Sequence, residues 1–336
     1  MVTSGDRRAV RALVIIPTHD HASTLDMAIS SALEQTFSDL EIVVIGDGVG
    51  EDTRQVIKRA LERDRRVSFV ECPKTPSRAE PLRHRVITDS EATIVTYLGD
   101  DDLFLPDHLS RTVEALKDHD FCHPYPTFIG SDHNVFCLPA DIADPNCRAW
   151  HLRHQHNRIS LTGAAHTMKL YRRLPFGWRA PPVGVWSDHY FFQDVLRIAN
   201  LRAKTLPEAT TIKTPAALTK EWSAEARRTA LQSWWTRIHA ADFAESWRRD
   251  VCLATQHAAS EFFASAIAVG QRDVAHLENR LARSGCKAEI PVDFDSEAYV
   301  ALYPDLMEAG VDGLDHFLKH GFHEGRLVPR KTRPDA

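Results

Sequence analysis

The N-terminal third of the chain alternates between short apolar runs and amphipathic stretches, and this order constrains the fold more than any other feature. Residues 12–16 form a continuous apolar run that is typical of a strand buried on both faces, and residues 42–45, 67–70 and 93–98 are the further expected strands. Stretches with helical spacing separate them at residues 25–33, 56–61 and 79–89, and a further helix is expected from Pro106 onward. This alternation predicts an α/β fold with a mostly parallel sheet flanked by helices.

The start of the first helix has a sequence signature of its own. Ser23 and Asp26 have the spacing of a capping box, in which the first side chain caps the helix and the second reaches back to it. We therefore expect Ser23 to be the residue that caps this helix.

Three polar loops follow strands of the predicted sheet: Thr18-His19-Asp20, Asp47-Gly48 and Asp100-Asp101-Asp102. Ligands of parallel sheets bind beyond the carboxyl ends of the strands, so we expect these loops to form one site. The three adjacent aspartates repel one another by about 1 kcal/mol per close pair. They fit either a solvated turn that caps the helix near Pro106 or a cation site, since Mg²⁺ is commonly held by one or two carboxylates together with substrate phosphates. The position on the binding edge favours the cation site.

Residues 12–109 resemble the family 2 inverting glycosyltransferases of the GT-A fold. The resemblance rests on VIIPTHDHASTLDMAISSALEQTFSDLEIVVIGDG and YLGDDDLFLPDHL, which occur in the order and at the spacing of that family. It implies a Rossmann-like, mostly parallel sheet flanked by helices and followed by a helical C-terminal region. It also implies a nucleoside-diphosphate-sugar donor, with a UDP-sugar favoured, and Mn²⁺ or Mg²⁺ as cofactor.

The resemblance implies donor-binding roles for residues that match the family's motifs. Pro17, Thr18 and His19 match the segment that packs around the base and the ribose. Asp47 matches the second acidic position of an Asp-Asp-Gly-Ser turn, which hydrogen-bonds the nucleobase.

Two arginines complete the implied donor site. Arg83 matches the arginine of an Ala-Arg-Asn segment near the donor, and Arg78 is a further candidate for the diphosphate. The chain departs from the family at two nearby positions, because Gly46 replaces the first aspartate of the turn and His84 replaces the asparagine.

The acidic loop itself is shifted by one residue. Gly99 stands where many members of the family carry the first aspartate of the DxD motif. Alignment on LFLPDHL then implies that Asp100 binds the ribose, that Asp101 binds the metal and that Asp102 is an auxiliary metal ligand. A literal DxD pair formed by Asp100 and Asp102 stays open.

Inverting transfer needs a general base that takes the proton of the acceptor hydroxyl. The segment WSDHYFF at residues 186–192 resembles the family's base-bearing segment, which implies that Asp188 is the base. Asp188 also fits the N-cap of the following helix, and both roles are compatible. On the acceptor side the candidates are His166, Trp178 and Trp186, although a core position suits each of them equally.

Other chemistries are weaker predictions. The third glycine of a dinucleotide fingerprint would fall on Glu51, and PTHDHAS has neither the glycines nor the lysine of a pyrophosphorylase phosphate loop. Two sets of neighbouring histidines suggest zinc, but no cysteine or acidic residue nearby completes a four-ligand set. These histidines are His151, His154 and His156, and His316, His320 and His323.

The remaining sequence predicts the organisation of the chain. We expect a catalytic domain at residues 1–214, with a donor half at 12–118 and an acceptor half at 119–214. A helical region at 215–289 has two apolar stripes, one with Leu231, Trp234, Trp235 and Ile238 and one with Phe262, Phe263, Ala266 and Ile267. Residues 290–336 resemble a small helical module that is appended to many bacterial glycosyltransferases.

Composition sets the expected location and partners. The net charge is -5 and no basic run stands out, which argues against nucleic acid as a partner. The 6 cysteines are scattered, and no signal peptide or membrane span is evident, so we expect a cytoplasmic protein. The expected acceptor is a hydroxyl of a glycan, a lipid-linked glycan or a protein. Peripheral membrane contact and a homo-oligomer formed through the helical region stay open.

The prediction from the sequence is therefore a metal-dependent inverting glycosyltransferase with Asp188 as general base. The alternative is a non-catalytic nucleotide-sugar-binding or scaffold protein on a decayed transferase fold, which the glycines at positions 46 and 99 motivate.

Overall fold

The computed structural model describes residues 11–75, 78–129, 135–137, 140–153, 158–214, 222–256, 290, 294–324, 326 and 329. The chain divides into two compact units, Met1–Ala258 and Ala259–Ala336, and each has its own core. Among the described residues, no helix is both long enough and apolar enough to cross a membrane.

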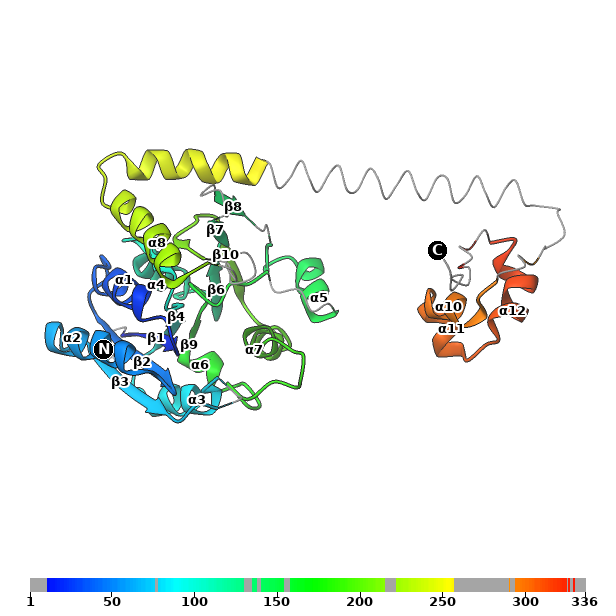
Figure 1. The fold of residues 1–336 in the computed structure, drawn as a ribbon, viewed down its shortest axis with the longest axis horizontal. Helices are drawn as coiled ribbons and strands as arrows, with labels where there is room; N and C mark the ends of the chain where they lie inside the picture. The colour runs from blue at the N-terminus through cyan, green and yellow to red at the C-terminus, as the bar shows by residue number, and fades with distance from the viewer. Residues whose placement is uncertain are drawn as a thin grey trace, which may run out of the picture. The chain divides into compact units, whose positions relative to one another are not determined.

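The centre of the first unit is a sheet whose described strands follow the order β10-β6-β9-β4-β1-β2-β3 (Figure 1). The strands β1 (Ala12–Thr18), β2 (Leu40–Asp47), β3 (Val67–Cys72) and β4 (Ile94–Tyr97) pair in parallel. β10 (Ala203–Leu206) is parallel to β6 (Phe121–Pro124). β9 (Ala165–Thr167) lies between β4 and β6 and is antiparallel to both. The predicted mostly parallel α/β sheet is therefore confirmed.

Helices cover both faces of this sheet because successive residues of a strand point to opposite sides. Leu13 and Ile15 of β1 pack with α3 (Glu80–Asp89), α6 (Met168–Tyr171) and α7 (Ser187–Leu196). Val14 and Ile16 pack with α1 (Ala22–Leu33), α2 (Glu51–Arg63) and α4 (His108–Ala115). The continuous apolar run that predicted β1 thus serves two separate cores.

The predicted capping box of α1 is wrong. The N-cap residue is His21, whose carbonyl oxygen accepts the backbone N–H groups of Thr24 and Leu25, and no side chain caps the helix. Ser23 lies inside the first turn. The ring of His21 instead contacts the acidic loop, where its Nδ1 lies 2.8 Å from Oδ1 of Asp100.

Short strands join the sheet to the segments that follow it. β5 (Leu103–Phe104) pairs with β11 (Thr211–Ile212), and β7 (Thr127–Ile129) pairs with β8 (Val135–Cys137). α5 (Pro145–Arg153) packs on α7. These pairings bring residues 211–214 next to the acidic loop, although more than a hundred residues separate the two in the sequence.

The helix α8 (Ala224–Ile238) lies along α1 (Figure 1). Leu231, Trp234 and Ile238 of the first predicted stripe are buried there, and Trp235 is partly buried. A further helix occupies residues 243–256. The second predicted stripe, at residues 262–267, lies outside the described residues.

The second unit is a set of short helices: α10 (Ser296–Ala301), α11 (Pro304–Ala309), α12 (Gly313–His316) and the π-helix η1 (Phe317–Gly321). Tyr299, Leu306 and Phe317 form its core. The division into domains at residues 214 and 289 stays a prediction.

Candidate donor and acceptor site

A cavity of about 680 Å³ lies at the carboxyl edge of the sheet. Its walls come from the loops after β1, β2, β3 and β4, from the N-terminus of α7 and from the end of β11. The lining residues are Pro17, Thr18, His19, Asp20, His21, Asp47, Lys74, Arg78, Arg83, Asp100, Phe128, Ile159, Ser160, Leu161, Trp186, Ser187, Asp188 and Lys213. The structure thus brings together most of the residues that the sequence analysis selected from separate loops.

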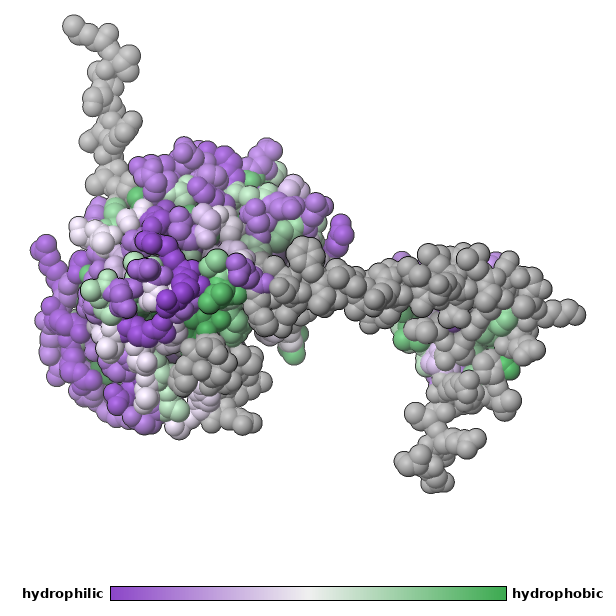
Figure 2. Space-filling view, turned by 90° about the horizontal axis from the view of Figure 1, so that it is seen from above, coloured by the Kyte–Doolittle hydropathy of each residue, from purple (hydrophilic) through white to green (hydrophobic). Residues whose placement is uncertain are grey.

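A second cavity of about 670 Å³ lies between the N-terminus of α4 and the helix at residues 243–256. Ile238, Phe243, Trp247 and Val251 give it a mainly apolar lining. It contains none of the acidic loop residues, so the polar cavity is the candidate site for a charged donor. The face of the first unit in Figure 2 is mostly hydrophilic, with one hydrophobic area.

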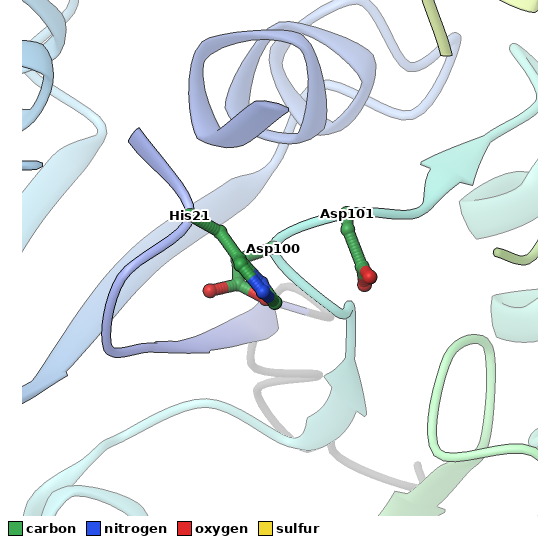
Figure 3. Close-up of side chains that lie close together, drawn as sticks. All are labelled: His21, Asp100 and Asp101. Atoms are coloured by element: carbon green, nitrogen blue, oxygen red, sulfur yellow. The ribbon is translucent and has the colours of Figure 1, made fainter. Parts of the chain in front are cut away.

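His21 and the acidic loop form the most highly charged part of the polar cavity (Figure 3). The Nδ1 atom of His21 lies 2.8 Å from Oδ1 of Asp100, and Asp101 projects from the next residue of the same loop. The hydrogen bond to Asp100 is the main reason that the pKa of His21 rises to about 9. Burial, together with the charges of Asp102 and Asp100, raises the pKa of Asp101 to about 7.

These residues fit a divalent cation. One ligand atom each of His21, Asp100 and Asp101 lies within 4.8 Å of the others. Among the described residues, no other group of three such side chains meets this condition. The raised pKa of Asp101 reflects burial first and the neighbouring negative charges second, and a bound cation would favour the ionised carboxylate against both. A ring nitrogen beside two carboxylates suits Mn²⁺ better than Mg²⁺, which prefers oxygen ligands, and the cation would take the place of the proton that Asp100 stabilises on His21.

Asp102 points away from this group. Its side chain is 2% exposed, accepts the hydroxyl of Thr162, accepts the N–H of Thr214 at 2.8 Å and lies 3.8 Å from Nζ of Lys213. The geometry therefore favours His21, Asp100 and Asp101 as the metal-binding set, in place of the expected pair Asp101 and Asp102. Asp100 would then act near the metal as well as near the ribose.

Asp47 lines the cavity, and its carboxylate is already hydrogen-bonded. It is 5% exposed and accepts hydrogen bonds from Nζ of Lys74 at 2.8 Å and from the N–H of Thr75 at 2.9 Å. Burial alone would raise the pKa of Asp47, but the hydrogen bonds from Lys74 and Thr75 hold it below its ordinary value. Arg78 is close by, on a turn with a left-handed backbone (φ 43°).

The expected acceptor residues His166 and Trp178 belong to the core and not to the cavity. His166 is fully buried, and its Nε2 lies 2.7 Å from the hydroxyl of Tyr97. Trp178 stacks on Phe191 with ring centroids 4.2 Å apart, and its Nε1 donates to the same hydroxyl at 2.8 Å. Both side chains are satisfied inside the aromatic core, so neither can contact an acceptor.

Arg83 connects this core to the cavity. Its guanidinium lies 4.2 Å from the centroid of the Trp178 ring, a cation–π contact, and only 3% of the residue is exposed. His84 does not line the cavity, because its Nδ1 lies 2.8 Å from the hydroxyl of Tyr171. The histidine that replaces the family's asparagine therefore serves packing.

The N-terminus of α7 also lines the cavity. Trp186 is its N-cap residue and is 52% exposed, and Asp188 lies in the first turn. Asp188 is thus not the N-cap, although a carboxylate in the first turn still stabilises the helix. Both side chains line the cavity, as expected for an acceptor residue and a base.

Of the histidines that suggested zinc, His151 does not line the cavity. His151 is buried, and burial lowers its pKa to about 4. His154 and His156 lie outside the described residues. In the second unit, Nδ1 of His316 lies 3.2 Å from the hydroxyl of Tyr299, which is a structural contact.

Residues 13–177 match the profile of glycosyl transferase family 2. Residues 13–177 are a glycosyl transferase family 2 domain.

Individual relatives agree with this assignment. A stretch of 105 residues is 30% identical to the GalNAc(5)-diNAcBac-PP-undecaprenol beta-1,3-glucosyltransferase of Campylobacter jejuni, and covers 31% of this chain and 34% of the relative. Another of 121 residues is 26% identical to an uncharacterised glycosyltransferase of Rickettsia bellii, and covers 36% of this chain and 17% of the relative. The chain thus matches only about a third or less of the length of these relatives.

The fold also agrees with that of a solved structure. The structure of TarS from S. aureus superposes with a TM-score of 0.50 at 13% identity, over 69% of this chain and 44% of TarS. At this identity the likeness shows the GT-A-type fold alone.

Part of the site lies beyond the matched segment of the glycosyltransferase domain. Asp188 and Lys213 follow residue 177, and so does Arg227 on α8, whose Nη1 lies 3.3 Å from Nε2 of His21. Sequence analysis missed His21, Lys74, Lys213 and Arg227. His21 could have been found, because it lies in the same quoted loop as His19. Lys213 and Arg227 could not, because only tertiary packing brings them to the site.

Proposed function

We propose that this chain is a metal-dependent inverting glycosyltransferase that moves a sugar from a nucleoside diphosphate, with UDP favoured, to a hydroxyl acceptor. One observation carries the proposal. The cavity is lined by His21 and Asp100, which form the candidate cation group with Asp101, and also by Asp188. An inverting transfer needs both in one site, because a base must activate the acceptor while positive charge stabilises the leaving diphosphate.

The residues of the chain have distinct roles in this proposal. Arg78 and Arg83 bind the donor, and the Asp47–Lys74 pair faces the nucleobase of the donor. The carboxylate of Asp188 takes the proton from the acceptor hydroxyl as its oxygen attacks the anomeric carbon. His21, Asp100 and Asp101 would hold Mn²⁺ or Mg²⁺, which supplies positive charge to the leaving diphosphate.

The acceptor is the less constrained part of the proposal. The C. jejuni relative is named for transfer to an undecaprenol-linked glycan, which supports a lipid-linked glycan over a protein. The exposed ring of Trp186 at the cavity rim supplies a flat apolar surface on which a sugar can stack. We propose that Trp186 contacts the acceptor.

Two substitutions test the mechanism. Asp188→Asn should lower the transfer rate by about 100-fold or more, because a positioned base contributes roughly that much. Asp101→Asn should abolish the stimulation by Mn²⁺. Asp118→Asn, at an exposed position outside the cavity, should retain full transfer. A thermal-shift screen of nucleoside diphosphates first identifies the nucleobase of the donor. Transfer is then measured with a UDP-sugar and an undecaprenol-linked glycan. Intact transfer in both test variants would refute the mechanism.

The same experiment separates the enzyme from a decayed scaffold. A scaffold would bind the nucleotide equally with and without Mn²⁺ and would neither transfer nor hydrolyse the donor.

A further inference from the structure

Lys213 is a cavity residue for which the family motifs provide no role. It follows β11, beyond the segment that matches the family profile. Its backbone N–H donates to the carbonyl of Thr127 at 3.0 Å, and its carbonyl accepts the N–H of Ile129 at 2.9 Å. The main chain of Lys213 is therefore fixed on both sides, and its side chain is 25% exposed and lines the cavity.

The ammonium of Lys213 is surrounded by the acids of the site. Its Nζ lies 3.8 Å from Oδ2 of Asp102, and the charges of Asp102, Asp188 and Asp101 all stabilise the ammonium. Asp101 belongs to the proposed cation site and Asp188 is the proposed base. The ammonium of Lys213 therefore interacts with the charge of the proposed base as well as with that of the proposed cation site.

Asp102 is fixed and cannot follow a ligand. The hydroxyl of Thr162 and the N–H of Thr214 both donate to its carboxylate, which is almost completely buried. A carboxylate that is held in this way sets the position of the ammonium beside it.

A purely structural ion pair explains these contacts less well. An ammonium has three N–H donors, and the 3.8 Å separation is longer than a hydrogen bond. Among the described residues, Asp102 is the only ion-pair partner of Lys213. The ammonium therefore keeps donors that face the cavity, where a strongly charged oxygen ligand fits.

We propose that Lys213 binds the diphosphate of the donor and that Asp102, with Thr162 and Thr214, is the positioning group for its ammonium. This inference rests on the proposed function. In the transfer, the acceptor oxygen bonds to the anomeric carbon while the bond from that carbon to the diphosphate oxygen breaks. The electron pair stays on the diphosphate, the hydroxyl proton goes to Asp188, and Lys213 stabilises the new negative charge.

Binding of UDP and of uridine to the full chain, measured by isothermal titration calorimetry with and without Mn²⁺, tests this role. Lys213→Met should lower the affinity for UDP by about tenfold or more, because the lost contact is charge-assisted. It should leave the affinity for uridine unchanged. Lys213→Arg should keep UDP affinity within about threefold. Lys117→Met, which removes an exposed lysine outside the cavity, should bind both ligands like the wild type.

Folding is controlled with a second variant, since Lys213→Met leaves the buried Asp102 without its cation. Lys213→Met/Asp102→Asn removes both charges. Its affinity for UDP relative to uridine should be as low as in Lys213→Met. Wild-type selectivity for UDP in either variant overturns the role of Lys213. Failure of the wild type to bind any nucleoside diphosphate would instead overturn the proposed function.

Discussion

Gly99 allows the acidic loop to close over a buried carboxylate. A Cβ atom at this position would lie 2.7 Å from Oδ2 of Asp102 and 3.2 Å from Oγ1 of Thr162. The N–H of Gly99 also donates to Thr162 at 2.9 Å. The glycine that replaces the usual aspartate of the family is thus required by the inward position of Asp102, and it does not indicate a decayed site.

Gly99→Ala should destabilise the first unit. The added methyl group must displace Asp102 or Thr162, and such overpacking costs about 1–3 kcal/mol. Urea unfolding measures the loss. Gly50→Ala is the matched control because its Cβ would meet nothing within 4 Å, and its cost as an N-cap change should stay below about 1 kcal/mol. Equal losses in the two variants would contradict the assigned role of Gly99.

His21→Ala should weaken Mn²⁺ binding in the absence of nucleotide by about tenfold or more, since metal affinity depends on the full ligand set. Calorimetric titration with Mn²⁺ provides the measurement. His19→Ala is the control, because His19 lines the same cavity but lies outside the group of His21, Asp100 and Asp101. Unchanged Mn²⁺ affinity in His21→Ala would restore Asp102 as the more plausible ligand.

The difference between Asp101 and Asp102 shows where sequence reasoning at the residue scale ends. The order of the three aspartates is local information, and it located the acidic loop correctly. The direction of each side chain depends on partners far away in the sequence. Thr162, Lys213 and Thr214 lie 60 or more positions from Asp102, so no local pattern could assign Asp102 to the interior.

At the element scale, the helix α7 separates two tryptophans that the sequence treated alike. Trp178 packs beneath it against Phe191, whereas Trp186 caps it and faces the cavity. Periodicity could predict α7 itself, because Phe192, Val195 and Leu196 share its buried face. It could not rank the two tryptophans, because each precedes the helix in a loop.

The same substitution at both positions tests this assignment. Trp178→Ala should cost about 3–5 kcal/mol, because it opens a cavity under Arg83 and Phe191. Trp186→Ala should change the free energy of unfolding by less than about 1 kcal/mol, because half of the residue is already exposed. Urea denaturation of both variants is sufficient. A larger loss at Trp186 would contradict its position at the cavity rim.

The strands divide in the same way into predictable and unpredictable elements. The sequence reveals β1, β2 and β4 because each is a mainly apolar run that is largely buried on both faces, whereas in the short strand β3 only Val67 is buried. The strands β5 and β11 have two residues each, too few to show a period. Yet this short pair brings residues 213 and 214 to Asp102, and so brings Lys213 to the cavity.

At the scale of the whole molecule, buried neutral histidines link stability to pH. Burial lowers the pKa of His108 and of His123 to about 3, and that of His151 and of His166 to about 4. The unfolded chain binds protons at these residues below about pH 6.5, whereas the folded chain does not. Their contribution to stability is therefore present above about pH 6.5 and is lost as the pH falls toward 4.

The free energy of unfolding should accordingly fall steeply between pH 6.5 and pH 4.5. Each histidine contributes at most about 1.4 kcal/mol per pH unit in this window. Asp101, with its pKa raised to about 7, acts in the opposite direction, as do Glu80 and Asp102, whose pKa values burial also raises. His21, with its pKa of about 9, does so above pH 6.5, so the net fall is smaller than the sum over the four histidines. Urea unfolding at pH 7.5 and pH 5 gives the comparison. A constant free energy across this range would show that the histidines become protonated without unfolding.

A substitution that disrupts the core of the second unit should leave the first unit unchanged. This core consists of Tyr299, Leu306 and Phe317 and is separate from the cores of the first unit. Gly321→Ala tests this independence. The new Cβ would lie 1.9 Å from the hydroxyl of Tyr299, so the core must rearrange at a cost of about 1–3 kcal/mol. Hydrogen exchange should accelerate in residues 294–324, and UDP affinity should stay at the wild-type value.

A double variant identifies the cause of this damage. Tyr299→Phe removes the oxygen that the new methyl group meets, at the cost of the contact with His316. Tyr299→Phe/Gly321→Ala should therefore exchange more slowly than Gly321→Ala alone, which is a favourable coupling between neighbouring sites. Additive effects would show that the π-helix, and not the hydroxyl, resists the substitution. Loss of UDP binding in Gly321→Ala would show that the two units depend on each other, and the donor site would then have to be sought in the whole chain.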